Sequence, residues 1–209
     1  MRIAPALLAA LLLIPLSCAA QREPLPKPPV VTILGSESDP RIPLVHEALE
    51  YWNGVFAEIG SPFRLGPVRL APGEISVDTL RGLSDSLVGT GRRSVPMPES
   101  VAAVPGELII ALSDGNFISF AASWPRQGKA LAAIKSHLVP PLTLPNVARN
   151  VIVHEIGHAV GLGHNSDPAL LMCGRPAPCR PDAMQSDTPR IFPLTAGEKE
   201  QLRRMYPPR

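Results

Sequence analysis

Three histidines and one glutamate lie within one short segment of this chain. Residues 154–164 are His-Glu-Ile-Gly-His-Ala-Val-Gly-Leu-Gly-His. In a helix, His154 and His158 lie one turn apart, so a single face presents both imidazoles. Gly161 can adopt a positive φ, which ends a helix and turns the chain so that His164 reaches the same point. Imidazole nitrogen is a favoured zinc ligand, so the spacing predicts one zinc ion bound by these three histidines.

Glu155 follows the first histidine directly and lies beside the same helix face. Its carboxylate is placed to hold a water molecule rather than to bind the metal. Three protein ligands leave one zinc position open, which is typical of a catalytic site, whereas a structural site is closed by four. A structural site would not need this carboxylate, so we expect Glu155 to act as a catalytic base. A zinc site without activity is the alternative.

A helix must carry the first two histidines. Apolar residues recur at helical spacing from Val147 to Val160, and Asn146 is a suitable N-cap, so we expect a helix over 146–160. A second amphipathic helix is expected over 42–59, begun by Asp39-Pro40 and stopped by Gly60.

The other elements are short. Strands are expected at 30–34, 63–70, 108–112 and 117–122, whereas 130–134 fits either a strand or a helical turn. Residues 71–105 are rich in Gly, Ser and Pro and are expected to be mostly loop. A last helix is expected through 202–206, opened by a capping box at Thr195–Glu198. This order predicts an α+β fold, a twisted mixed sheet with an active-site helix and a C-terminal helix.

The segment 146–172 resembles the metzincin zinc metalloproteases and, within them, the matrixin or matrix-metalloprotease-like branch. Met172 follows His164 by the spacing at which that family has its Met-turn methionine beneath the zinc. The resemblance therefore implies a metzincin-like catalytic domain with Met172 as a structural residue. A generic core methionine is the alternative.

The resemblance extends weakly to the Asp114-Gly115 turn and the strand after it. It implies that the backbone of Phe120, Ala121, Ala122 and Ser123 pairs with an extended substrate as an added strand. An ordinary sheet edge is the alternative.

The resemblance also implies that residues 173–193 form a wall of the specificity pocket. Ile191 and Phe192 are candidate lining residues. Core packing is the alternative for both.

The chain departs from the matrixin pattern at several positions. Asn165 stands where Ser or Thr is common, and Cys173-Gly174 stand where an aromatic residue and Pro are usual. The family's structural zinc uses further histidines, but the spare histidines here, His46 and His137, do not match them, and the Gly-rich calcium loop is absent. These departures argue against a second zinc ion and against calcium.

Residues 1–20 are expected to be a secretory signal peptide, because the apolar stretch 3–16 is too short to span a membrane. Cys18-Ala19-Ala20 fits cleavage before Gln21. Alternatively, Leu16-Ser17-Cys18 resembles a lipobox, in which case the signal ends before Cys18 and a lipid on Cys18 tethers the protein to a membrane. We therefore expect an exported protein, either secreted or anchored to the cell envelope.

Residues 21–29 are proline-rich and are expected to form a tether before a catalytic domain at 30–209, which leaves no room for a prodomain with a cysteine switch. Cys173 and Cys179 remain after the leader, and an even pair in an exported protein predicts a disulfide, with free buried thiols as the alternative.

Composition narrows the function further. The chain has 209 residues, with 20 Lys and Arg against 18 Asp and Glu, and only 4% aromatic residues, which argues against a nucleic-acid partner. The sequence therefore predicts a zinc-dependent endopeptidase that acts on peptides or proteins. The second hypothesis is an exported zinc-binding module that binds a peptide or protein without cleaving it.

Overall fold

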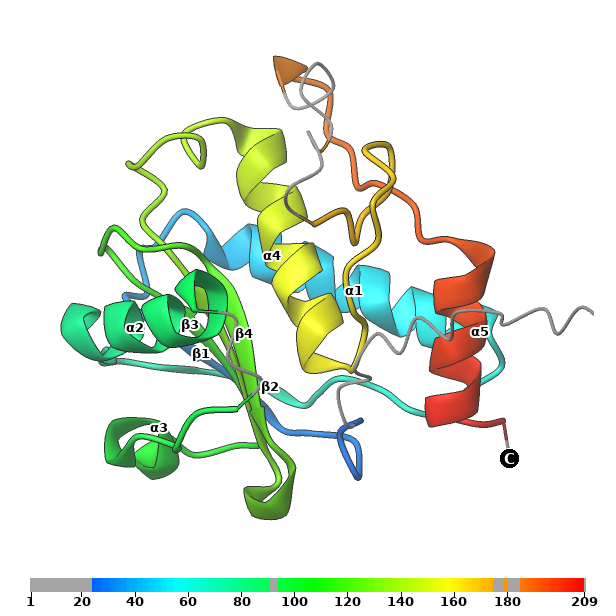
Figure 1. Ribbon diagram of the computed structural model, residues 1–209, viewed down its shortest axis with the longest axis horizontal. Helices are drawn as coiled ribbons and strands as arrows, with labels where there is room; N and C mark the ends of the chain where they lie inside the picture. Colours follow the sequence, from blue (N-terminus) through cyan, green and yellow to red (C-terminus); the bar gives the residue numbers. More distant parts are fainter. Residues whose placement is uncertain (1–23, 91–93, 175–178, 180–184, 209) are drawn as a thin grey trace, which may run out of the picture.

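A computed structural model describes residues 24–90, 94–174, 179 and 185–208 (Figure 1). The predicted signal peptide and Cys18 lie outside these residues. The described chain contains a mixed five-stranded sheet with helices on both faces, which confirms the predicted α+β fold class. No helix among the described residues combines the length and the apolar composition that crossing a bilayer requires.

The sheet has the strand order β2-β1-β3-β5-β4. The strands β1, β2, β3 and β5 run parallel, and β4 runs antiparallel to β5 at one edge. Their bounds are Val31–Leu34 for β1, Val68–Ala71 for β2, Leu108–Leu112 for β3, Phe120–Trp124 for β4 and Lys129–Ile134 for β5. Every residue of β1 and β3 is buried, as expected for parallel strands covered on both faces.

Alternate residues of the strands enter two separate cores. Ile110 and Ala132 belong to the main core, which also contains the buried faces of α1 (Ile42–Glu58) and α4 (Pro145–Ala159). Ile109 and Leu131 belong to a second core on the opposite face of the sheet. Figure 1 shows α1 and α4 on one side of the sheet, and α2 and α3 on the other.

The prediction that residues 71–105 are mostly loop was wrong. They contain α2 (Val77–Ser84), a short π-helix (Asp85–Gly89) and α3 (Glu99–Ala103). Leu80, Leu83 and Val101 are buried in the second core, so burial against the sheet stabilises helices that their Gly- and Ser-rich composition does not favour.

Two strand boundaries also differ from the predictions. The strand expected at 63–70 is confined to β2, because Asn53 binds the backbone of Leu65 and so takes that residue out of the sheet. The strand expected at 117–122 begins only at Phe120, and Phe117 packs in the second core ahead of it. Pairing with β3 and β4 makes 130–134 a strand.

The start of α4 is a third correction. The sequence suggests Asn146 as the N-cap, but Leu144 occupies that position and Pro145 is the first helical residue. Proline suits this position because the first helical N–H has no partner within the helix. Asn146 lies inside the helix, and its amide binds the backbone of residues 186 and 188 instead.

The C-terminal helix α5 (Ala196–Met205) begins with the predicted capping box of Thr195 and Glu198. At the other end of the chain, the described part of the predicted tether packs against the domain. Leu25 is buried and its N–H donates to the hydroxyl of Tyr206, just after α5, while Lys27 pairs with Glu107.

Candidate metal centre

The three predicted histidine ligands converge at the C-terminal half of α4. One ring nitrogen from each of His154, His158 and His164 lies within 4.8 Å of the others. The Nε2 atom of His164 is 3.3 Å from Nε2 of His154 and 2.8 Å from Nε2 of His158. Nitrogens bound to one tetrahedral zinc ion lie roughly 3.3 Å apart, so the group is compact enough to share one ion.

Backbone carbonyls orient two of these rings. Nδ1 of His154 lies 2.8 Å from the carbonyl oxygen of Leu171, and Nδ1 of His158 lies 2.8 Å from that of Leu162. A carbonyl can only accept, so each Nδ1 carries the proton and each Nε2 offers its lone pair to the shared point. The donor set therefore fits a zinc ion bound through three Nε2 atoms.

The turn that returns the chain to this point follows α4 directly. Gly161 has a φ of 104°, a conformation that L side chains rarely adopt. The N–H of Leu162 donates to the carbonyl of Gly157, and the N–H of Gly161 donates to that of His158. These bonds close the helix and bring His164 back toward its end.

Met172 lies against the turn of α4 that carries His154 and His158 and is completely buried. A Cβ atom built on Gly157, between the two helical histidines, would lie 2.7 Å from Sδ of Met172 and 2.8 Å from the Trp52 ring. The indole N–H of Trp52 donates to the carbonyl of Val153. Met172 and Trp52 thus support the helix turn that presents the histidines.

Gly174 is a site residue that sequence reasoning treated only as a departure from the family pattern. A Cβ atom there would lie 2.3 Å from Cγ of His164 and 2.6 Å from its Nδ1, so only glycine leaves room for this ring. Asn165 donates its N–H to the carbonyl of Met172, and Gly174 donates its N–H to that of Asn165. Cys173, the residue before Gly174, forms the predicted disulfide with Cys179.

Asn165 and Glu198 connect the third ligand to α5. The Asn165 side chain donates to Oε1 of Glu198 at 2.7 Å, while Oε2 of Glu198 accepts from the N–H of Thr195. One carboxylate therefore caps α5 and holds the residue after His164. The capping-box pattern predicts the first role, whereas the second depends on tertiary packing.

Glu155 lies on α4 directly after His154 and is 6% exposed. The remaining histidines are elsewhere: within the described ranges, His46 and His137 do not join the three-histidine group.

The predicted substrate strand lies on β4, beside α4, at an edge of the sheet. Phe120, Ala121 and Ala122 are buried, and Ser123 is half-buried. Its pairing with a substrate stays a prediction.

The two candidate lining residues differ in burial. Phe192 is buried in the main core, as the alternative interpretation expects, and Ile191 is half-buried and packs against that core. Part of the proposed wall, residues 175–178 and 180–184, lies outside the described residues.

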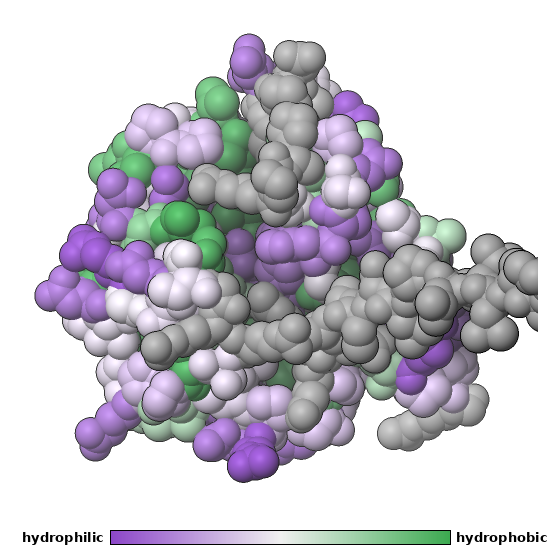
Figure 2. All heavy atoms as spheres, in the orientation of Figure 1, coloured by the Kyte–Doolittle hydropathy of each residue, from purple (hydrophilic) through white to green (hydrophobic). Residues whose placement is uncertain are grey.

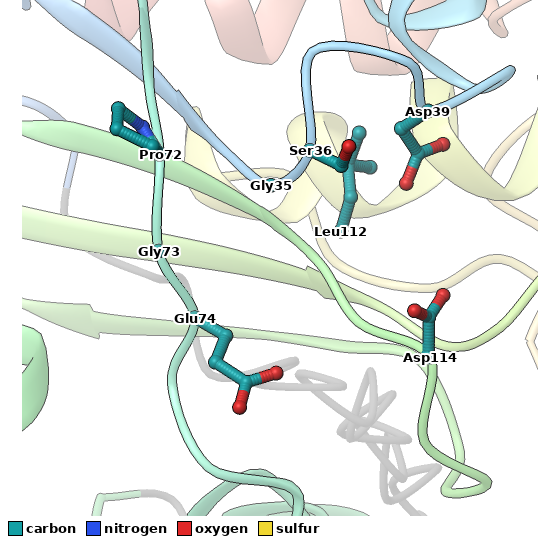
Figure 3. Close-up of a pocket in the computed structure, with 8 residues that line it drawn as sticks. All are labelled: Gly35, Ser36, Asp39, Pro72, Gly73, Glu74, Leu112 and Asp114. Carbon is teal, nitrogen blue, oxygen red and sulfur yellow. The ribbon is translucent and has the colours of Figure 1, made fainter.

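A pocket of about 320 Å³ lies away from the histidines, at the carboxyl ends of β1, β2 and β3 (Figure 3). The carboxylates of Asp39 and Asp114 point toward each other across it. Asp39 is paired with the buried Arg41 at 2.6 Å, so its charge is already compensated within the fold.

The molecular face that carries α4 combines polar and apolar surface (Figure 2). Apolar side chains gather at the upper left of that view, where the chain runs from β5 to α4 in Figure 1. Leu138 and Leu144, in this connection, are 73% and 37% exposed.

No protein-family model and no curated protein matches this chain. Among solved structures, it is similar to archaemetzincin from Methanopyrus kandleri, with a TM-score of 0.42, 18% identity and coverage of 84% of this chain and 93% of that chain. It is also similar to a zinc-dependent peptidase from Methanocorpusculum labreanum, with a TM-score of 0.41, 16% identity and coverage of 82% and 99%. The chemistry of the site therefore has to follow from its own residues.

Proposed function

We propose that this protein is a zinc-dependent endopeptidase of the metzincin type. The observation that carries the proposal is the convergence of three Nε2 atoms, two of them oriented by backbone carbonyls, next to a buried carboxylate. A bound zinc ion would supply Lewis-acid polarisation of the scissile carbonyl and a lowered pKa for water. His154, His158 and His164 would hold it, and a set of three protein ligands would leave one position open for chemistry.

Glu155 is the general acid–base group in this proposal. Its carboxylate takes a proton from the attacking water and later delivers it to the leaving amine. Its place in the helix, one residue after His154, keeps it beside the metal ligands without making it one of them.

The substrate in this proposal is an extended peptide that adds to the edge of the sheet at β4. The edge position of β4 and its packing beside α4 support this placement. Met172 follows His164 at the sequence spacing of the family's Met-turn and packs against the helix turn, which supports assignment to the matrixin-like branch. Asn165 and Cys173-Gly174 depart from the pattern of that branch.

The decisive experiment compares the wild-type domain with Glu155→Gln on a diverse peptide mixture, with new termini identified by mass spectrometry. Glu155→Gln should keep one zinc per chain and lose roughly 10²- to 10⁴-fold in cleavage rate, which is the usual contribution of a general base. Glu50→Gln, an exposed glutamate on α1, is the matched control and should cleave like the wild type. Cleavage that survives in Glu155→Gln would exclude Glu155 as the base.

The zinc-binding module without turnover makes a different prediction. In that case the wild type binds one zinc ion and binds peptides but produces no new termini. Zinc content and peptide affinity, measured on the same sample, separate the two functions.

We also propose that the protein is exported and either secreted or anchored through Cys18. The mass of the mature N-terminal peptide tests this localisation. An acyl group on Cys18 would establish the anchor, and a mature chain that begins at Gln21 would exclude it.

A further inference from the structure

The first two turns of α4 carry two buried asparagines that the zinc chemistry does not use. Asn146 is 1% exposed and Asn150 is fully buried, and the two lie one helical turn apart on the same face. Both side chains bind the backbone of residues 186–192, which lies between the Met172 turn and α5.

Each amide uses both its donor and its acceptor. The Asn146 Nδ2 donates to the carbonyls of Ser186 and Thr188, at 2.6 and 2.8 Å, and its Oδ1 accepts from the N–H of Arg190 at 3.1 Å. The Asn150 Nδ2 donates to the carbonyl of Arg190 at 2.7 Å, and its Oδ1 accepts from the N–H of Phe192 at 2.9 Å.

The bonded backbone groups belong to alternate residues, 186, 188, 190 and 192. From Arg190 to Phe192 this alternation is that of an extended chain, whose backbone groups point alternately to either side. Thr188 lies in a bend, which lets the one Asn146 amide reach the carbonyls of both Ser186 and Thr188. A helix has no free backbone groups along its length to pair with such a chain, because its own turns use them. The two amides supply the missing donors and acceptors, so they hold residues 190–192 as a partner strand would and also bind the bend before them.

Arg149 fixes the orientation of the first amide. Its Nη1 donates to Oδ1 of Asn146 at 2.9 Å, and its Nε donates to the carboxylate of Glu47 on α1 at 2.7 Å. Since an arginine can only donate, Oδ1 must face it, and Nδ2 must face the carbonyls of the segment.

The segment runs toward the metal centre. Asn150, which holds Phe192, lies one helical turn before His154. The next carbonyl, that of Pro193, accepts from the N–H of Leu171, and the carbonyl of Leu171 orients the His154 ring. The half-buried Ile191, between the two residues that Asn150 bonds, is therefore held in a segment whose next carbonyl is bonded beside the His154 ring.

We propose that Asn146 and Asn150 are positioning residues that set the substrate selectivity of the cleft by holding residues 186–192 as its wall. The proposal rests on the endopeptidase function proposed above. It differs from a purely structural role because it requires changes in selectivity, not only in stability.

The test compares Asn150→Ala and Asn146→Ala with Asn53→Ala. Asn53 is a matched control because its amide also holds a loop to a helix, with bonds to the N–H and carbonyl of Leu65, away from the metal centre. All three variants should keep one zinc per chain. By hydrogen–deuterium exchange, the Phe192 amide should exchange about 10-fold faster or more in Asn150→Ala, and the Arg190 amide should do so in Asn146→Ala.

Selectivity is then measured in two ways, by the cleavage profile of a peptide mixture and by affinity for a panel of peptide hydroxamates with different side chains. In Asn150→Ala we expect KM to rise about 10-fold for the preferred peptide, with kcat changed less than about threefold. We also expect a smaller difference between the preferred and the other side chains, both in cleavage and in hydroxamate affinity. Asn53→Ala should leave both preferences as in the wild type. Asn150→Asp keeps the acceptor for Phe192 but sets a buried carboxylate against the carbonyls of Arg190 and Asn146, so it should change the preference at least as much as Asn150→Ala.

Faster exchange at Phe192 with unchanged preferences would overturn the proposal and leave the amides a structural role only. Unchanged exchange in both alanine variants would overturn it too. If Asn150→Ala does not fold, Asn146→Ala decides by the same criteria. A wild type that binds hydroxamates selectively but cleaves no peptide would refute the endopeptidase alone, and the hydroxamate panel would still decide the role of the asparagines.

Discussion

Backbone groups in loops orient the histidine rings. The carbonyls of Leu171 and Leu162 set the rings of His154 and His158, and the backbone at Gly174 lies against the ring of His164. A small shift of these loops therefore moves a ligand directly. Metal ligands commonly rely on such supporting contacts for their affinity.

Gly174→Ala tests this dependence at the residue scale. A Cβ atom 2.3 Å from the His164 ring must displace the ring or the loop, because both neighbours are close-packed. We expect zinc affinity to fall roughly 10- to 100-fold, measured by competition with a chelating dye. Gly163→Ala is the control, since a Cβ atom there meets nothing within 4 Å although it is adjacent to His164. Equal zinc affinity in the two variants would contradict the close contact.

At the scale of elements, a buried arginine connects α1 to the sheet. Arg41 is 1% exposed, and its guanidinium donates to the carbonyls of Ser113 and Lys135, which follow β3 and β5. Asp39 accepts two further bonds from it, at 2.9 and 2.6 Å. The start of α1 is thereby fixed to the ends of the two strands beneath it.

The stability that Asp39 contributes should depend on pH. Burial alone would raise the pKa of Asp39, but the hydrogen bonds from Arg41 outweigh burial and hold the pKa below its ordinary value of 3.8. A carboxyl with a lowered folded pKa stabilises the protein above its unfolded pKa, and this stability is lost as the pH falls through the folded pKa. Asp39→Asn should therefore lower the free energy of unfolding by about 3 kcal/mol at neutral pH and by progressively less below pH 3.8.

Chemical denaturation at several pH values measures this difference. Asp78→Asn is the control, because its pair with Arg81 is exposed and should contribute less than about 0.5 kcal/mol. A difference between wild type and Asp39→Asn that does not change with pH would show that the charge of Asp39 is not the stabilising feature.

At the scale of the whole molecule, one tyrosine connects the segment at Leu25 and the residues after α5 to the end of α4. The hydroxyl of Tyr206 accepts from the N–H of Leu25 and donates to the carbonyl of Val160 at the end of α4. Its ring packs edge-on against Phe56 and is tilted against Phe63. The N-terminal segment, the C-terminal residues and α4 thus share one buried hydrogen-bonding group.

Alkaline pH should break this connection. Burial raises the pKa of Tyr206, and burial together with the charges of Glu198 and Glu58 raises the pKa of Tyr51, the other tyrosine of the chain. The unfolded chain loses these protons near pH 10.0, before the folded protein does, so stability falls as the pH rises above that value. Tyrosinate absorbance should therefore appear together with the loss of circular dichroism rather than ahead of it.

Tyr206→Phe is the informative variant for this prediction. It should lower the free energy of unfolding by about 1–3 kcal/mol at neutral pH, because the N–H of Leu25 and the carbonyl of Val160 lose a partner. It should also weaken the alkaline dependence, since one of the two tyrosines no longer titrates. Ordinary tyrosinate formation in the folded wild type, well before unfolding, would refute the burial argument.

The sequence by itself predicted the convergence of the three histidines, because the His154–His164 pattern needs only one helix turn and one glycine, and both follow from local geometry. The capping box of α5 was local in the same way. The fold class followed from the order of apolar segments, and the disulfide from the cysteine count.

Tertiary structure decided what depends on contacts between distant segments. The helices within 71–105 exist because the far face of the sheet buries Leu80 and Val101, whereas their composition alone indicates a loop. Asn146 was predicted as the helix N-cap because asparagine strongly prefers that position. Instead Pro145 begins the helix, and the Asn146 side chain forms hydrogen bonds with the backbone of residues 186–190. The close approach of Gly174 to His164 has no signature in sequence, since the two residues meet only when the loop after Met172 returns beside the third ligand.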